Sequence, residues 1–282
     1  LMPVRELASM PALAPLFAKA LIPSFSTGPA RVPEYALRVA GVRQELDRLA
    51  AYDQVCGFRV RDEVSPTWLH VLSFPLHVQL LSGSDSSVRL AGVVHVSNTM
   101  TLHRPVTSAE TLDVSVRVQN LHPHRRGAML DLVGEISVDG ALVWEGVSTY
   151  LAPGAHTPGE PEVLDRPAFE PRSPIARWNL PADLGRQYRR VSGDPNPIHT
   201  HLLAAKAFGF ARPIIHGMWT HARVLSALEA RLPQTYTAAV SFAKPILLPA
   251  TVAAWWSPSR DGWSAAVTTV DGSKPFLTVE IS

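Results

Sequence analysis

The chain has 282 residues, of which 46% are hydrophobic and 18% are charged, a composition typical of a folded globular protein with one large or two ordinary domains. The net charge is +2 and no run of Lys or Arg stands out, which argues against binding to nucleic acid or to an anionic membrane surface. The single cysteine, Cys56, excludes an internal disulfide and a cysteine-based zinc site, and no apolar run approaches the length of a membrane-spanning helix.

Residues 7–22 are apolar and rich in alanine, but Pro11, Pro15 and Lys19 interrupt them. A secretory signal has a cleaner apolar run, followed by a cleavage site with small residues. We therefore expect a short packed helix or an arm here, and a cytoplasmic protein.

The first half of the chain predicts one long helix followed by antiparallel strands. Residues 65–81 begin with Ser-Pro, a helix start signal, and are apolar around most of the helix circumference. Pro75 inside this segment predicts a kink. Residues 112–119 alternate strictly between apolar and polar side chains, as a half-buried strand does. The other expected elements are a strand or loop at 34–42, a helix at 42–51, and strands at 128–138 and 141–150 joined by a turn at Asp139-Gly140.

Residues 153–174 contain six prolines, too many for a helix or a central strand. We interpret this stretch as a linker. It divides the chain into an N-terminal domain, 1–152, and a C-terminal domain, 175–282.

The second half repeats the order of the first. A long helix is expected to end before Pro233, and strands follow it. Two short stretches, 102–106 and 242–246, also match each other locally. The helix shows one apolar face, formed by Met218, Ala222, Leu225, Leu228 and Leu232. The strands are expected at 236–242, 252–257, 263–270 and 276–281.

The segment before this helix carries the residue types needed for acid–base chemistry. Asp194 and His199 lie five positions apart, on a turn that Pro195 and Pro197 make stiff. A helix starting near residue 198 would place His199 in its first turn, where the helix dipole disfavours an imidazolium ion. A carboxylate and a neutral imidazole can together hold one water molecule and move protons on and off it. Asn196, between them, is a candidate for substrate binding.

Gly217 begins the long helix, where a backbone N–H lacks an intrahelical partner and could serve as an oxyanion donor. There are plainer interpretations. Gly217 could only allow close packing of the helix, Asp194 could be a turn residue, and His199 could bond to nearby backbone. The combination of the three favours the chemical interpretation.

The run YRRVSGDPNPIH at 188–199, followed by Ala205 and by His216-Gly217-Met218, resembles the hydratase 2 motif. That motif marks the MaoC-like, (R)-specific enoyl-CoA hydratases and the related 3-hydroxyacyl-thioester dehydratases, which are hotdog proteins. The resemblance extends from about residue 183 to the end of the sequence. His201 departs from it, because many relatives carry an acidic residue there, and this bears on substrate preference.

With the internal repeat, the resemblance implies an α+β double hotdog, in which each half is a long central helix wrapped by a curved antiparallel sheet. It implies reversible hydration of a trans-2-enoyl thioester in fatty-acid metabolism, with coenzyme A or acyl carrier protein as the carrier. It implies no cofactor, and a homodimer is a further expectation. Water held between Asp194 and His199 would attack C3 while a proton reaches C2, with the Gly217 N–H stabilising the thioester oxygen. Which of Asp194 and His199 is the base stays open.

The first half lacks Asp-x-Asn-Pro-x-His, and at the position of His216-Gly217 we expect His70-Val71. The first half is therefore expected to be catalytically silent. In similar double-hotdog hydratases, such a half supplies the wall of the acyl pocket.

Other functions were weighed against this one. His199 and His201, two positions apart, and His216 and His221, five apart, have poor spacing for a shared metal ion, so no metal site is expected. A hotdog thioesterase and a non-catalytic acyl-binding module remain the alternatives.

Overall fold

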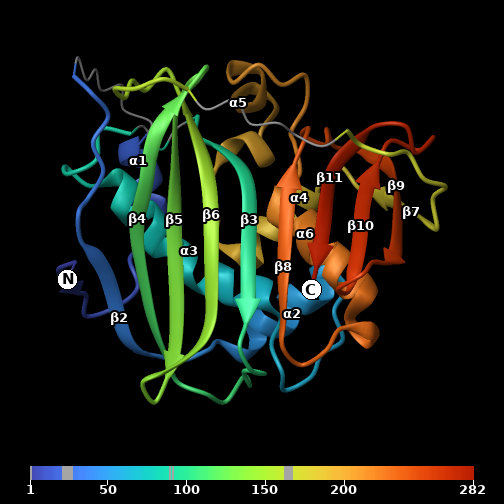
Figure 1. Cartoon of the computed structure of the whole chain (residues 1–282), viewed down its shortest axis with the longest axis horizontal. Helices are drawn as coiled ribbons and strands as arrows, with labels where there is room; N and C mark the ends of the chain where they lie inside the picture. Colours follow the sequence, from blue (N-terminus) through green and yellow to red (C-terminus); the bar gives the residue numbers. More distant parts are fainter. Residues whose placement is uncertain (1, 21–27, 89, 91, 162–167) are drawn as a thin grey trace. The chain divides into compact units, whose positions relative to one another are not determined.

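The computed structural model describes residues 2–20, 28–88, 90, 92–161 and 168–282 (Figure 1). Contacts between residues divide the chain into two compact units. Unit 1 comprises Leu1–Gln44 and Asp62–Leu164, and unit 2 comprises Glu45–Arg61 and Asp165–Ser282. Of the segments discussed above, residues 21–22 and the linker residues 162–167 lie outside the described residues.

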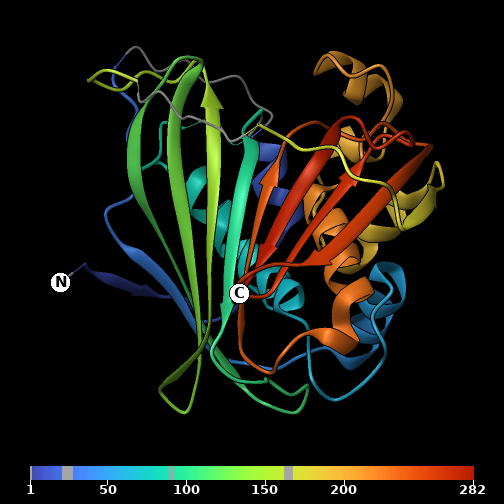
Figure 2. The same cartoon turned by 45° about the vertical axis from the view of Figure 1, so that its right-hand side comes forward.

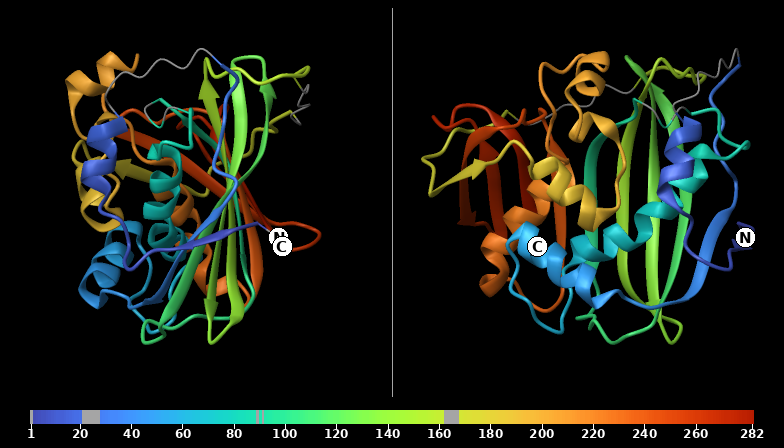
Figure 3. Two further views of the ribbon diagram at one scale, coloured as in Figure 1. Left: turned by 90° about the vertical axis from the view of Figure 1, so that its left-hand side faces the viewer. Right: turned by 180° about the vertical axis from the view of Figure 1, so that it is seen from behind.

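Unit 1 is a sheet with a long helix lying across it. Its strands are β1 (Val4–Glu6), β2 (Ala36–Val42), β3 (Val94–Leu102), β4 (Leu112–His124), β5 (Gly127–Val138) and β6 (Ala141–Pro153), and its helices are α1 (Leu13–Ala20) and α3 (Pro66–Ser82). The strand order is β1-β2-β4-β5-β6-β3, and the neighbours pair antiparallel except for β1 with β2. α3 packs on the face of this sheet, and α1 packs on α3 (Figure 3, right).

α3 forms where the sequence predicts it. Ser65 caps its N-terminus, since its Oγ accepts a hydrogen bond from the Trp68 N–H at 3.2 Å, and Pro66 occupies the first turn, where no N–H is needed. Pro75 lies inside the helix, which continues to Ser82. The helix is buried around most of its circumference, in agreement with its apolar sequence.

Unit 2 also packs helices on an antiparallel sheet. Its strands are β7 (Ala176–Leu180), β8 (Tyr236–Phe242), β9 (Ala250–Pro258), β10 (Trp263–Thr268) and β11 (Pro275–Ile281). Its helices are α2 (Leu46–Cys56), α4 (Leu184–Ser192), α5 (Leu202–Ala207) and α6 (Gly217–Leu228), with short 3-10 helices at Pro197–His199 and Glu229–Arg231. The strand order is β8-β11-β10-β9-β7, drawn mostly in orange and red in Figure 2. α6 packs against β10 and β11.

The helix expected at 42–51 lies at Leu46–Cys56 and belongs to unit 2, so the expected N-terminal domain differs from unit 1 at this segment. α2 packs against α4 and α6. The Trp219 indole N–H donates to the Val55 carbonyl at 2.9 Å, and the Ser226 hydroxyl donates to the Cys56 carbonyl at 2.9 Å. α2 belongs to unit 2 because its side chains are buried against these helices, although its sequence position is in the first half of the chain.

The strand and helix predictions are mostly confirmed. The strands expected at 128–138, 141–150, 236–242, 252–257, 263–270 and 276–281 are present with small shifts at their ends. β1, β3 and β7 were not predicted. No helix among the described residues combines the length and apolar character needed to cross a membrane.

The two units share one local arrangement at the start of their long helices. Before α3, the Val64 N–H donates to the Val106 carbonyl at 2.9 Å. Before α6, the Ile215 N–H donates to the Ile246 carbonyl at 3.0 Å. The acceptors end the two short stretches, 102–106 and 242–246, that match in sequence.

This register corrects our expectation of which residues in the first half correspond to His216-Gly217. Because Val64 corresponds to Ile215, the step His216-Gly217 corresponds to Ser65-Pro66 and not to His70-Val71. Proline has no N–H. Unit 1 therefore has no backbone donor at the place where Gly217 has one.

Candidate active site

Asp194 lies on a turn fixed by local hydrogen bonds. Gly193 ends α4 in the left-handed conformation, with φ of 78°, and its N–H donates to the Arg189 carbonyl at 2.8 Å. Asp194 Oδ1 accepts a hydrogen bond from the Asn196 N–H at 2.9 Å. One carboxylate oxygen thus fixes the turn, and Oδ2 is left for chemistry.

Asn196 caps the short 3-10 helix Pro197–His199, since its Oδ1 accepts a hydrogen bond from the Ile198 N–H at 3.3 Å. This structural role was not predicted from the sequence. The cap does not use the Nδ2 group of Asn196, which is available to donate to a substrate.

His199 is held in one tautomer. Its Nδ1 lies 2.8 Å from the carbonyl oxygen of Ile214, which can only accept, so Nδ1 carries the proton and Nε2 has a free lone pair. His199 ends the 3-10 helix and does not occupy the first turn of an α-helix, which corrects the expected placement. Burial lowers the pKa of His199, while Asp194 and the Ile214 carbonyl raise it. The imidazole is therefore kept neutral by desolvation, not by a helix dipole.

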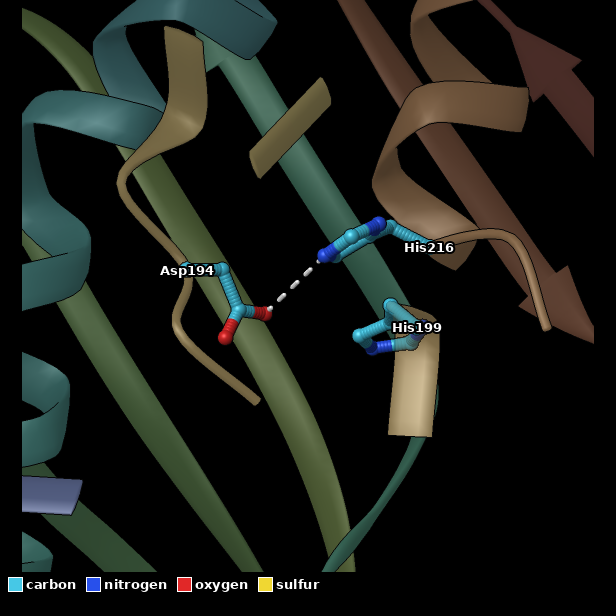
Figure 4. Close-up of side chains that lie close together, drawn as sticks. All are labelled: Asp194, His199 and His216. Carbon is cyan, nitrogen blue, oxygen red and sulfur yellow. Dashed lines mark ion pairs between the residues drawn. The ribbon is translucent and has the colours of Figure 1, made fainter. Parts of the chain in front are cut away.

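His216 joins this pair and was missed in the sequence as a site residue. It is the N-cap residue of α6, is 4% exposed, and its ring stacks on that of His199 with centroids 3.6 Å apart and planes at 26°. Its Nε2 lies 3.6 Å from Asp194 Oδ2 (Figure 4). The signal in the sequence was its place in the motif, directly before Gly217.

Burial shifts the proton affinities of the three groups toward one another. It raises the pKa of Asp194, while His199, the Asn196 N–H and Arg189 lower it. Burial also lowers the pKa of His216 well below its usual value, and His199 and Arg189 lower it further. A carboxylic acid with raised pKa beside neutral imidazoles is suited to proton transfer near neutral pH.

Two glycines allow close approach of backbone at the site. A Cβ at Gly185, in α4, would lie 2.1 Å from the carbonyl oxygen of His199. A Cβ at Gly217 would lie 2.8 Å from Cε1 of Phe242. Gly217 therefore has the packing role of the plainer interpretation, and its first-turn position also leaves an N–H without an intrahelical acceptor.

α4 itself is fixed by α2. Arg48 Nε donates to the Val191 carbonyl at 2.7 Å, and Arg48 Nη2 donates to the Ser192 carbonyl at 3.1 Å. These bonds satisfy carbonyls at the C-terminus of α4. The helix segment near the beginning of the chain thus supports the turn that carries Asp194.

Relatives show which family this chain belongs to. The model of the MaoC like domain matches residues 162–270. The 3-hydroxyacyl-thioester dehydratase X of Mycobacterium tuberculosis is 36% identical over 254 residues, which are 89% of this chain and 90% of that protein. The chain belongs to the MaoC-like dehydratase family. The predicted resemblance is confirmed, and this protein is an enzyme of that family.

Solved structures confirm the fold of this MaoC-like dehydratase. The crystal structure of HtdX of Mycobacterium tuberculosis matches with a TM-score of 0.78 and 34% identity, over 87% of this chain and 98% of that one. A second Mycobacterium tuberculosis protein, described as a double hotdog, matches with a TM-score of 0.53 and 13% identity, over 90% and 95% of the chains. The α+β double-hotdog prediction is confirmed.

A metal ion would fit poorly in this MaoC-like dehydratase. Among the described residues, the group with suitable ligand atoms is Asp194, His199 and His216, whose atoms lie within 4.8 Å of one another. This group differs from both histidine pairs considered in the sequence, His199 with His201 and His216 with His221. A metal-bound nitrogen points its lone pair at the ion in the plane of its ring, at about 2.1 Å. Stacked rings cannot both do so, and no metal site is assigned.

Proposed function

We propose that the enzyme catalyses the reversible hydration of trans-2-enoyl thioesters to (R)-3-hydroxyacyl thioesters. The observation that carries this proposal is the pairing of Asp194 with His199. Their ligand atoms lie within 4.8 Å of each other, a span that one water molecule can bridge by two hydrogen bonds. The fixed Nδ1–H tautomer of His199 leaves Nε2 free to accept a proton of that water.

In the hydration direction, the water oxygen forms a bond to C3 of the enoyl thioester and gives up one proton to the pair. The electrons of the double bond move toward the thioester oxygen, and a proton from the pair is then delivered to C2 on the same face. The N–H of Gly217 is our candidate for stabilising the negative charge on that oxygen. The two groups share their protons, so we assign the base to the pair and not to one member.

The substrate class follows that of the Mycobacterium tuberculosis relative, a 3-hydroxyacyl-thioester dehydratase. We propose a coenzyme A or acyl carrier protein thioester of fatty-acid metabolism as the substrate, with Asn196 Nδ2 as a contact and no cofactor. We also propose that unit 1 is the silent half that lines the acyl chain. The replacement of Gly217 by Pro66 at the corresponding position supports its silence. Cytoplasmic location, a homodimer and a domain boundary within 153–174 remain proposals.

The test is hydration of crotonyl-CoA, followed by the loss of enoyl absorbance. Asp194→Asn keeps the shape of the side chain but removes its proton transfer, so kcat should fall about 100- to 10,000-fold. The matched control is Asp261→Asn, at an exposed aspartate in the turn between β9 and β10, which should keep activity near wild type. An Asp194→Asn enzyme with a kcat within a few-fold of wild type would show that the carboxylate is only structural.

The same experiment separates the alternatives. Release of free thiol from crotonyl-CoA by the wild-type protein would indicate a thioesterase. Binding of an acyl thioester without any turnover would indicate a non-catalytic acyl-binding module.

A further inference from the structure

His216 has no role in the proposed reaction, yet it is placed as if it had one. It is buried, its ring covers one face of the His199 ring, and its Nε2 faces Asp194 Oδ2 at 3.6 Å (Figure 4). Neither of its ring nitrogens has a hydrogen-bond partner among the described residues. A buried polar group without a partner is costly, so such a group in an active site calls for an explanation.

The geometry determines which nitrogen of His216 carries the proton. Nε2 of His216 is paired with Oδ2 of Asp194, a carboxylate oxygen, which accepts hydrogen bonds and, when ionised, cannot donate one. An unprotonated Nε2 would place its lone pair against the lone pairs of that oxygen. A neutral His216 is therefore favoured with its proton on Nε2, directed at Asp194, and with Nδ1 unprotonated.

His199 has the opposite arrangement, because the Ile214 carbonyl fixes its proton on Nδ1. We propose that His216 is a positioning residue whose Nε2–H orients the Asp194 carboxylate and whose ring supports His199, so that the two stacked imidazoles carry opposite tautomers. This inference rests on the proposed hydration for its kinetic consequence, but not for the tautomers themselves.

The contact of 3.6 Å is longer than a hydrogen bond. Such contacts in substrate-free sites often shorten once substrate fills the site and excludes water. A donor at Oδ2 then favours the ionised form of Asp194. The neutral face of His216 does not stabilise charge on His199, so a proton accepted by His199 is readily passed on.

Other groups facing these residues share the electrostatics. Tyr188 packs against His216 with ring centroids 4.8 Å apart, and Arg189 favours the ionised form of Asp194 and disfavours charge on His216. Their influence is the same in each variant below, because each changes only residue 216.

The first test uses the unaltered protein. Nitrogen-15 NMR of uniformly labelled histidines distinguishes a protonated from an unprotonated ring nitrogen. We expect His199 with Nδ1 protonated and His216 with Nε2 protonated at neutral pH. His216 with Nδ1 protonated and Nε2 free would overturn the inference whatever the activity, and failure of the hydration assay would leave this result intact.

The second test separates the donor from the ring. His216→Phe keeps a stacking ring and loses the donor, whereas His216→Gln keeps an N–H at a similar reach and loses the ring. Because the donor acts on a charged group, its loss in His216→Phe should lower kcat by about 10- to 100-fold with KM within a few-fold. It should also move the acidic limb of the kcat–pH profile to higher pH. His216→Gln should restore that limb.

A His216→Phe enzyme with the kcat and acidic limb of wild type would refute the positioning role. So would His216→Gln with the same displaced limb as Phe, because this would assign the effect to the ring. Melting temperatures are recorded for both variants, and if His216→Phe does not fold, the NMR result and the pH profile of His216→Gln decide. Loss of activity in Asp194→Asn is the control that the proposed chemistry itself holds.

Discussion

Replacing Gly185 by Ala should damage catalysis through the position of His199. The added Cβ would lie 2.1 Å from the carbonyl oxygen of His199, whereas ordinary contacts begin near 3.4 Å and distances under 3.0 Å are essentially never seen. The two pieces of backbone must therefore separate by between 0.9 and 1.3 Å, the differences between these limits and the built distance.

The part that moves is expected to be the segment with His199. α4 is held by Arg48 through two hydrogen bonds to its last carbonyls, whereas Pro197–His199 is a single 3-10 turn. A displacement of His199 by about 1 Å would carry Nε2 away from the water that we propose it shares with Asp194. Misplacement on this scale costs about 100-fold in rate.

The assay compares kcat/KM for crotonyl-CoA hydration in Gly185→Ala and wild type, together with the melting temperature. Gly83→Ala is a matched control, because a Cβ at Gly83 would have its nearest neighbour at 3.5 Å, an ordinary contact. We expect about a 100-fold loss for Gly185→Ala and wild-type activity for Gly83→Ala. A folded Gly185→Ala enzyme with activity within threefold of wild type would refute the argument that close packing of α4 positions His199.

Three further predictions concern the rest of the molecule. Burial raises the pKa of Asp53 to about 7, and Glu229 acts in the same direction. As pH rises from about 4 to 7, Asp53 ionises in the unfolded chain before it ionises in the folded protein, so the free energy of unfolding falls. Asp53→Asn should therefore raise the melting temperature at pH 8 but not near pH 4, and an equal effect at both would contradict this. Limited proteolysis should cut first within 153–174 and leave the two pieces associated; a first cut within 112–150 would speak against the two-domain proposal. Val71→Phe, at a buried position of α3, should lower kcat/KM for long enoyl chains more than for crotonyl-CoA, because each methylene excluded from the pocket is worth about 0.8 kcal/mol. An equal loss on both substrates would indicate that unit 1 is only a scaffold.

The sequence alone determined the local structure around the site. The prolines at 195 and 197 predicted a stiff turn between Asp194 and His199, and Gly217 was expected to begin the long helix, as it does. These predictions hold because backbone preferences act over a few residues and do not depend on what packs nearby. The motif of those same residues also predicted the family and the fold.

Only the tertiary structure decided what surrounds the pair. His216 stacks on His199 from another element, Gly185 touches it from α4, and Arg48 supports α4 from a helix that we had assigned to the other half. The correspondence of Pro66 in the first repeat to Gly217 in the second was likewise visible only in the backbone hydrogen bonds. Such contacts join residues far apart in the chain, and the burial of whole helix faces selects them, so no local pattern of residues records which side chains will meet.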